Sequence, residues 1–224
     1  KLYEILEKSL KKSKYFKKYK FKNNLNYFDK YNIVINTDHS NLITQKYFSK
    51  KIIKKYNSYA YSCIIDHQNI LNDTATQIFT KKGPLAFLPI SSKKTSIVYS
   101  IKNSKKIKDR TIIDLINHYN FKYKIKKINK IEKFELKSIN LRCYYHNKFL
   151  AFGDLLHKIH PLAGQGFNMT LRDIKILLNI IKKRKELGLP MDYSINKEFE
   201  KKIRHKNYIF SNSIDLIYEF FSLE

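Results

Sequence analysis

The sequence is poor in the residues that usually interrupt regular structure. Its 224 residues include five glycines, four prolines and two cysteines, and no tryptophan. Cys63 and Cys143 are too few and too far apart for a disulfide framework or a zinc site, so we expect a reducing compartment and no bound metal. A run of about 18 apolar residues is also missing, so we expect no membrane-spanning helix. Nothing reads as a secretory signal either.

Apolar and aromatic residues are plentiful enough for a folded core. They make up 43% and 14% of the chain respectively, which is too hydrophobic for a disordered protein and predicts one large or two small globular units. The sequence starts with Lys1 rather than methionine, and we therefore expect these residues to be part of a longer chain.

The net charge of +26 would ordinarily suggest a nucleic-acid or anionic-membrane partner. Lysine is spread along the whole chain, whereas a phosphate-reading surface more often concentrates arginine, whose planar fork fits phosphate oxygens. Nucleic acid is therefore not the expected partner, although weak attraction to anionic lipid is plausible. The arginines are Arg110, Arg142, Arg172, Arg184 and Arg204.

Hydrophobic periodicity predicts an α/β chain with an antiparallel sheet in its middle. Leu2 to Leu10 have helical spacing, and Tyr31 to Asn36 read as a buried parallel strand that ends in a polar turn. Short apolar runs separated by turn residues fill 58–101 and predict an antiparallel meander, followed by a helix around Ile107 to Ile116 and an extended stretch to about Leu141. A strand in 148–154 precedes a helix whose apolar stripe, Leu171, Ile174, Leu177, Leu178 and Ile181, is expected to face a core.

The three glycines Gly153, Gly164 and Gly166 lie within fourteen residues, between that strand and that helix. A helix N-terminus offers unpaired N–H groups and a partial positive charge, and glycine lets a flat ligand approach the backbone. Asp154 follows a strand end, where α/β sheets present polar groups to ligands. The segment is typical of a cofactor cradle, and an ordinary helix-capping loop is the alternative.

This segment resembles the flavin-binding segment of FAD-dependent aromatic monooxygenases of the para-hydroxybenzoate-hydroxylase type, and most closely the ubiquinone-biosynthesis hydroxylases. Elsewhere in the chain, FTKKGPLAFLPI (79–90) and the pattern of Phe199, Glu200, Arg204 and Asn207 also resemble that family. The matched positions of the flavin segment are Gly153, Asp154, His157, His160, Pro161, Ala163, Gly164, Gln165, Gly166, Phe167, Asn168, Arg172 and Asp173.

Two features depart from the family pattern. The GxGxxG loop that holds the ADP part of FAD in this family does not occur in these residues, which we interpret as truncation. The family's Asp-Gly motif corresponds to Asp38 and His39, so a histidine replaces the glycine and Ser40 comes one position early.

The resemblance implies a fold made of the C-terminal portion of a Rossmann-like FAD-binding domain, an inserted, mainly antiparallel sheet domain for the substrate, and a C-terminal helical region. The corresponding boundaries are 1–56 and 143–186 for the FAD-binding parts, 57–142 for the substrate domain and 187–224 for the last helices.

The implied reaction is hydroxylation of an aromatic ring by a flavin C4a-hydroperoxide, with O2 as co-substrate and NAD(P)H as electron donor. The resemblance assigns cofactor binding to Asp38, Gly153, Asp154, Pro161, Gly164, Gln165, Gly166 and Asn168. Backbone N–H groups around Gly164 to Gly166 would stabilise the reduced flavin, and Asp154 would hold the ribityl chain. No side chain is identified as an acid or base catalyst, and His157 and His160 are more typical of structural hydrogen-bonded groups.

The implied substrate is a polyprenylated phenol in ubiquinone biosynthesis, which would bring a cytoplasmic protein to the inner face of a membrane or to a lipid-handling partner. Phe87 and Pro89 are candidates for the substrate pocket, with ordinary core packing as their alternative. Two other interpretations stay open for the whole chain, namely a truncated or diverged non-catalytic flavoprotein-like domain and a basic nucleic-acid-binding protein.

Overall fold

A computed structural model describes residues 2–19, 25–102, 107–159 and 165–220. The chain divides into two compact units, residues 1–31 and 32–224. The first unit contains α1 (Leu2–Lys11), as its periodicity predicts, and the short 3-10 helix η1 (Leu25–Phe28). In this unit the Glu7 carboxylate forms ion pairs with Lys11 at 3.3 Å and with Lys18 at 3.2 Å.

A small three-stranded sheet in the second unit joins two distant parts of the sequence. β1 (Val34–Asn36) pairs in parallel with β9 (Phe149–Ala151), and β8 (Tyr145–His146) pairs antiparallel to β9. The predicted parallel strand is therefore present, although it is shorter than the run 31–36 and Ile35 remains exposed. The six-residue helix α2 (Leu42–Tyr47) follows β1, with Asn41 as its N-cap.

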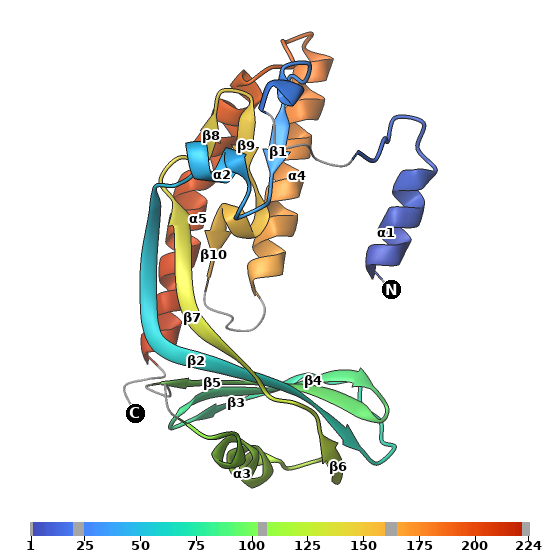
Figure 1. The fold of residues 1–224 in the computed structure, drawn as a ribbon, viewed down its shortest axis with the longest axis vertical. Helices are drawn as coiled ribbons and strands as arrows, with labels where there is room; N and C mark the ends of the chain where they lie inside the picture. The colour runs from blue at the N-terminus through green and yellow to red at the C-terminus, as the bar shows by residue number, and fades with distance from the viewer. Residues whose placement is uncertain (1, 20–24, 103–106, 160–164, 221–224) are drawn as a thin grey trace. The chain divides into compact units, whose positions relative to one another are not determined.

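The large antiparallel sheet has seven strands and confirms the predicted meander. Its order is β10-β7-β2-β5-β4-β3, and β6 pairs with β2. β2 and β7 continue past the other strands toward the small sheet and run beside the C-terminal helix (Figure 1). The strands are β2 (Lys51–His67), β3 (Thr76–Thr80), β4 (Gly83–Ser91), β5 (Lys94–Lys102), β6 (Ile125–Ile128), β7 (Glu132–Leu141) and β10 (His157–Lys158).

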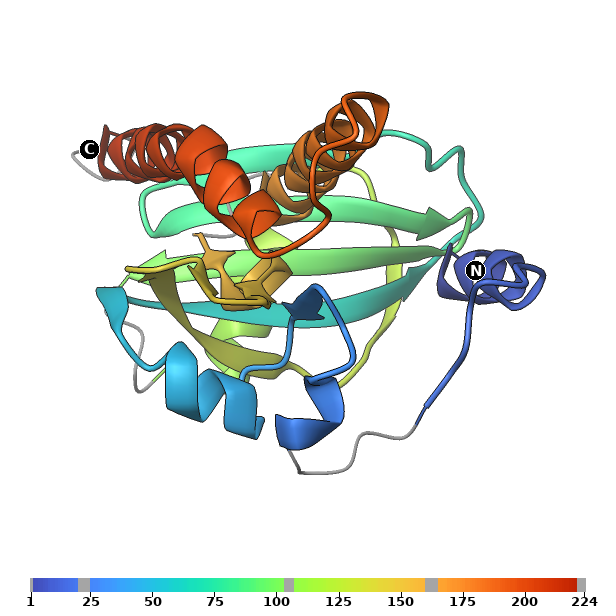
Figure 2. The same cartoon turned by 90° about the horizontal axis from the view of Figure 1, so that it is seen from above.

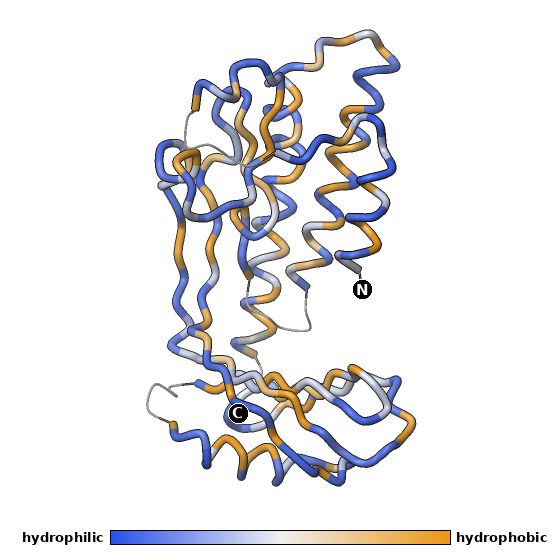
Figure 3. Tube along the Cα trace, turned by 45° about the vertical axis from the view of Figure 1, so that its right-hand side comes forward, coloured by the Kyte–Doolittle hydropathy of each residue, from blue (hydrophilic) through white to orange (hydrophobic). Residues whose placement is uncertain are grey.

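The main core lies between this sheet and α3 (Asp109–Tyr119). Alternate residues of the strands point to the helix because side chains on a strand alternate between its faces. Cys63 on β2 belongs to this core, and burial raises the pKa of its thiol to about 11, whereas Cys143 is exposed. Hydrophobic and hydrophilic residues alternate along the strands and helices, as amphipathic elements require (Figure 3).

Two long helices complete the second unit. α4 (Gln165–Glu186) packs against α5 (Ser194–Phe220), and Figure 2 shows both lying over the strands of the large sheet. The buried residues of α4 are Met169, Asp173, Leu177 and Ile180. The expected stripe is confirmed at Leu177. It is wrong at Leu171, Ile174 and Leu178, because the helix turns its 169–173–177–180 face inward and leaves these three side chains exposed.

Mixed α/β architecture, an antiparallel sheet and a C-terminal helical region are thus confirmed. The four expected domain boundaries stay predictions. No helix of the described ranges is long and apolar enough to cross a membrane.

Candidate functional site

The parallel pairing of β1 with β9 brings two predicted site residues to one edge of the small sheet. Asn36, the last residue of β1, lies opposite Ala151, the last residue of β9. The backbone N–H of Phe152 then donates to the Asn36 carbonyl at 2.9 Å, which extends the pairing by one step. Asp38 and Asp154 both follow this point in the sequence. The carboxyl ends of parallel strands are the edge at which α/β sheets bind ligands.

Gly153 forms the turn that exposes Asp154. Its φ of +62° lies in the left-handed region, which strongly favours glycine, and the 3-10 helix η2 (Gly153–Leu155) begins there. The turn is closed by the N–H of Leu156, which donates to the Gly153 carbonyl at 2.9 Å. Asp154 is exposed, and no hydrogen bond or ion pair reaches its carboxylate from the residues that the structure describes. Its oxygens are therefore available as acceptors.

Asp38 is engaged by its own turn. Its Oδ1 accepts hydrogen bonds from the Ser40 N–H at 2.7 Å and from the Ser40 hydroxyl at 2.8 Å. Both bonds lower the pKa of the Asp38 carboxyl, and the bond from the backbone N–H has the larger effect. Behind the turn, Thr44 donates to the Asp38 carbonyl and the Asn36 amide donates to Thr44 at 2.8 Å, so the loop is fixed from below.

His39 stands where the family has glycine, yet its backbone does not need one. Among the described non-glycine residues, positive φ values occur at Asn57 and Asn147. The His39 side chain is exposed. The serine that comes early, Ser40, is the residue that holds the Asp38 carboxylate, so the shifted motif still closes its turn.

The first turn of α4 begins at Gln165 and contains Gly166. A Cβ built on Gly166 would meet nothing within 4 Å, and its φ is not in the left-handed region. Neither packing nor backbone conformation in the described residues therefore explains a glycine here, which fits a position kept bare for a ligand. Asn168 is exposed and donates to the Gln165 side chain at 3.3 Å. Pro161 and Gly164, like His160, lie outside the described residues.

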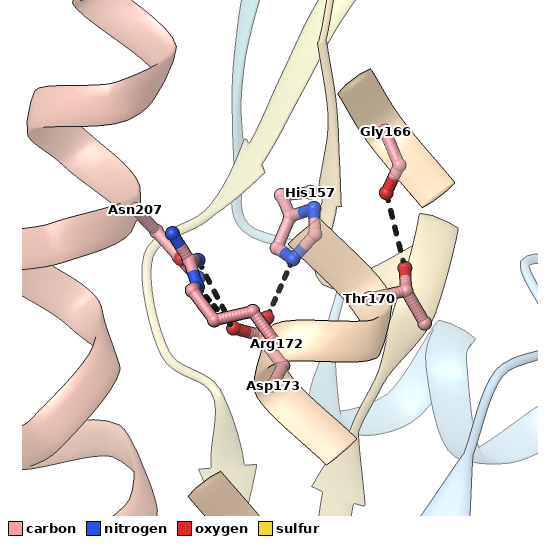
Figure 4. Close-up of polar contacts among 6 residues, drawn as sticks. All are labelled: His157, Gly166, Thr170, Arg172, Asp173 and Asn207. Carbon is pink, nitrogen blue, oxygen red and sulfur yellow. Dashed lines mark hydrogen bonds and ion pairs between the residues drawn. The ribbon is translucent and has the colours of Figure 1, made fainter. Parts of the chain in front are cut away.

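A cluster of polar side chains around the buried Asp173 connects this helix to its neighbours (Figure 4). His157 Nε2 lies 2.8 Å from Asp173 Oδ2, and both side chains are buried. Arg172 donates to Asp173 Oδ1 through Nε at 3.2 Å and through a terminal nitrogen at 3.0 Å, and it also contacts Asn207 of α5. The cluster ties β10, which precedes residues 160–164, to α4 and α5. His157 is thus a structural hydrogen-bonded group, as expected.

The motif match included Arg172 and Asp173 but gave them no role. Their role becomes visible only in three dimensions, because Asn207 lies 35 residues further along the chain from Arg172. The available sequence signal was an acidic residue on the otherwise apolar inward face of the helix, since a charge is rarely buried without partners.

The two substrate candidates lie on the α3 side of the large sheet. Phe87 is fully buried in the main core, where its ring contacts Phe121 at 5.8 Å and Tyr123 at 5.7 Å between centroids. Pro89 shares that face by alternation and is half-buried. Core packing, the alternative reading of Phe87, is therefore what the structure shows for this side chain.

The opposite face of β4 carries Ala86, Leu88 and Ile90, and the latter two are exposed. β10 and the first turn of α4 lie on this side of the sheet, whereas α3 covers the other (Figure 1). Neighbouring residues of a strand lie on opposite faces of the sheet. Predicting Phe87 and Pro89 as pocket residues therefore selected the α3 face and not the face that carries Ala86, Leu88 and Ile90.

Solved structures of other proteins share this fold. The R204Q variant of Klebsiella pneumoniae HpxO, solved in complex with FAD, superposes with a TM-score of 0.61 at 12% identity, and the match covers 86% of this chain and 57% of that one. PqsL of Pseudomonas aeruginosa, described as a probable FAD-dependent monooxygenase, also has a TM-score of 0.61 at 12% identity, covering 82% and 53%. At this identity the likeness establishes the fold alone.

Sequence relatives are more specific. The 3-demethoxyubiquinol 3-hydroxylase of Escherichia coli (strain K12) is 28% identical over 174 residues, which cover 73% of this chain and 44% of that protein. Ubiquinone hydroxylase UbiL of Rhodospirillum rubrum is 23% identical over 177 residues, covering 75% and 41%. No family model matches the sequence. The chain spans less than half the length of these two relatives, and its resemblance to the ubiquinone-biosynthesis hydroxylases is confirmed.

Proposed function

We propose that this chain forms the flavin-binding and substrate-covering part of an FAD-dependent monooxygenase that hydroxylates the ring of a lipophilic phenol in ubiquinone biosynthesis. The observation that carries the proposal is the bare side of Gly166 in the first turn of α4, in the same stretch of chain as the exposed carboxylate of Asp154. Hydroxylation through a flavin C4a-hydroperoxide, with NAD(P)H and O2, is the reaction that the sequence resemblance implies and is part of this proposal.

The described residues fit the flavin end of FAD. The first backbone N–H groups of α4, near Gln165 and Gly166, have no partners within the helix and carry its partial positive charge. They would stabilise negative charge on the pyrimidine side of the ring, and Asn168 would meet its edge. Asp154, exposed after the Gly153 turn, would accept hydrogen bonds from the ribityl hydroxyls. Pro161 and Gly164 would complete the loop, as the family pattern implies.

Asp38 has a different role in this proposal. Its carboxylate stays ionised because the Ser40 N–H and hydroxyl lower its pKa, and a fixed anion repels phosphate rather than binding it. The fixed turn can instead offer backbone N–H groups to the pyrophosphate and position the pyridine-nucleotide donor. Ser40 and Thr44 keep this turn rigid.

The substrate ring is proposed to lie against the face of the large sheet opposite α3. That face carries Ala86, Leu88 and Ile90 on β4 and Val98 on β5, and Ala86 lies directly opposite Val98. Apolar side chains with few polar groups suit a polyprenylated ring. Phe87 would support this wall from within the core, and Pro89 would shape the end of β4 next to its irregular pairing with β5.

A lipophilic substrate of this class is dissolved in the bilayer, so the protein is proposed to work at the inner surface of a membrane or with a lipid-handling partner. The lysine-rich surface supports this placement because basic residues near an anionic membrane each contribute about 1 kcal/mol of attraction.

The test is FAD binding by the Gly166→Val variant of the complete protein. The branched side chain would occupy the bare side of α4, and we expect FAD affinity to fall by about tenfold or more, because a displaced cofactor loses its backbone hydrogen bonds. Lys175→Val is the matched control, since it places the same side chain at an exposed position on the same helix. Flavin absorbance and NAD(P)H-dependent O2 uptake are measured, with thermal unfolding as the check on folding.

A yellow protein whose flavin is lost in Gly166→Val and kept in Lys175→Val supports the proposal. A complete protein that takes up no FAD would favour the alternative of a diverged, non-catalytic flavoprotein-like domain. Binding of duplex or single-stranded nucleic acid with a steep salt dependence would instead favour a basic nucleic-acid-binding protein.

A further inference from the structure

A cavity of about 780 Å³ lies between the start of β2, the end of β7 and α5. Its lining contains none of the residues assigned above to FAD or to the substrate ring. Ligand pockets in proteins typically enclose about 300–1,000 Å³, so this cavity can hold a small organic molecule. α5 is held in place along it, because the Asn140 amide donates to Ser211 at 3.4 Å and Tyr56 donates to Asp215.

The lining is strongly cationic. It includes Lys54, Arg142, Lys201 and Arg204, against the single carboxylate of Asp215. Two of the chain's five arginines therefore meet in one cavity, in a protein whose positive charge otherwise comes from dispersed lysine. Arginine presents a planar fork of donors that matches phosphate oxygens.

Some of these cations are already paired and others are not. Lys54 Nζ lies 3.0 Å from Asp215 and 2.9 Å from Glu219, so its charge is compensated. Arg204 lies 3.7 Å from Glu200, a looser pair. Arg142 and Lys201 have no carboxylate partner among the residues that the structure describes. Arg142 and Lys201 therefore contribute uncompensated positive charge to the cavity.

Apolar side chains lie beside these cations. Ile52 of β2 is 54% exposed and Tyr208 of α5 is 67% exposed, and both line the cavity together with Leu141. Exposed apolar surface next to unpaired cations fits a ligand that has an anionic head and an apolar portion.

We infer that this cavity binds the phosphate group of a phosphate monoester, with Arg142, Lys201 and Arg204 around the phosphate and the apolar part of the ligand against Ile52 and Tyr208. The headgroup of phosphatidic acid and a water-soluble organic phosphate share this chemistry. The inference concerns a second site and does not rest on the proposed hydroxylase function.

The experiment measures binding by isothermal titration calorimetry at about 0.15 M salt, where attraction between distant exposed charges is largely screened. The probes are dioctanoyl phosphatidic acid below its micelle concentration, glycerol phosphate and inorganic phosphate. The pocket variant is Arg142→Gln/Lys201→Gln. Its matched control, Arg110→Gln/Lys127→Gln, removes the same residue types at exposed positions on α3 and β6. Co-sedimentation with phosphatidylcholine vesicles, with and without phosphatidic acid, forms the second arm.

We expect the pocket variant to bind dioctanoyl phosphatidic acid at least about tenfold more weakly, since charge-assisted hydrogen bonds are lost. The control should bind as the unchanged protein does, and both variants should unfold at similar temperatures. Tighter binding of the lipid than of glycerol phosphate, with co-sedimentation only on phosphatidic-acid vesicles, identifies a lipid headgroup, and equal binding of the two identifies a water-soluble phosphate. An equal loss in both double variants, or no binding of any probe, would overturn the inference.

Discussion

The Asp173 carboxylate is the charge that we expect to be least replaceable in the second unit. It is 1% exposed and is held by His157 and Arg172. In Asp173→Asn the half-buried Arg172 guanidinium and the buried His157 imidazole lose their anionic partner. Breaking a buried pair from one side typically costs about 3 kcal/mol or more. We therefore expect the free energy of unfolding, measured by urea denaturation, to fall by about 3 kcal/mol.

Asp154→Asn is the control for this change. Its carboxylate is exposed and has no described partner, so the same loss of one negative charge should leave the free energy of unfolding within about 0.5 kcal/mol of its original value. Equal stability of the two variants would show that the cluster in Figure 4 does not hold α4 in place.

The β3–β4 hairpin depends on a single glycine. Gly83 has a φ of +133°, and a Cβ on it would lie 2.2 Å from the Ser100 carbonyl oxygen of β5. Because that oxygen belongs to the backbone of a central strand, it cannot move aside cheaply. We expect Gly83→Ala to lower the free energy of unfolding by about 2–4 kcal/mol in urea denaturation.

Gly188 offers a comparison in which only the backbone conformation matters. It follows the last turn of α4 with a φ of +66°, and a Cβ there would meet nothing within 4 Å. Gly188→Ala should therefore lower the free energy of unfolding by about 1 kcal/mol, because only the strain of the left-handed conformation is added. If Gly83→Ala costs no more than Gly188→Ala, the contact with Ser100 does not constrain the hairpin.

The net charge of +26 affects the stability of the whole chain. Like charges repel in the compact state, and salt screens this repulsion, with a Debye length of about 30 Å at 0.01 M and about 8 Å at 0.15 M. We expect the midpoint of thermal unfolding to rise as sodium chloride is increased over this range. Sucrose at equal osmolality is the control, because it does not screen charge. A midpoint that falls with salt would mean that ion pairs such as Lys18–Glu7 outweigh the repulsion.

Local patterns predicted the secondary structure well wherever both period and turn residues were present. The meander from 58 to 101 was predicted from short apolar runs separated by turn residues such as Asn72-Asp73 and Lys82-Gly83, and α3 from the spacing of Ile112 and Ile116. Pairing between distant segments is harder to read. A parallel-type strand was predicted at 31–36, but its pairing with β9 was not, because the sequence of β1 does not indicate which strand it pairs with.

Those parts of the candidate site that depend on residues close together in the sequence could be predicted. Gly153 and Gly166 were identified by glycine scarcity, and the structure gives them different reasons, a left-handed turn and an open side. Burial on α4 was predicted correctly for Leu177 and wrongly for Leu171, Ile174 and Leu178. Hydrophobicity alone did not indicate Asp173, whose burial is compensated by partners from β10 and α4, with Arg172 also contacting α5. Such compensation cannot be read from one helix.

The two cysteines differ in burial, so the rate at which each thiol is labelled can measure how often the core opens. Cys143 is exposed and should react with an alkylating reagent at once, which calibrates each sample. Cys63 lies in the core under α3, and burial keeps its thiol protonated up to a pKa of about 11, so it can react only when the large sheet opens. The slow phase of a two-thiol labelling curve therefore reports how often that core opens, without any engineered probe.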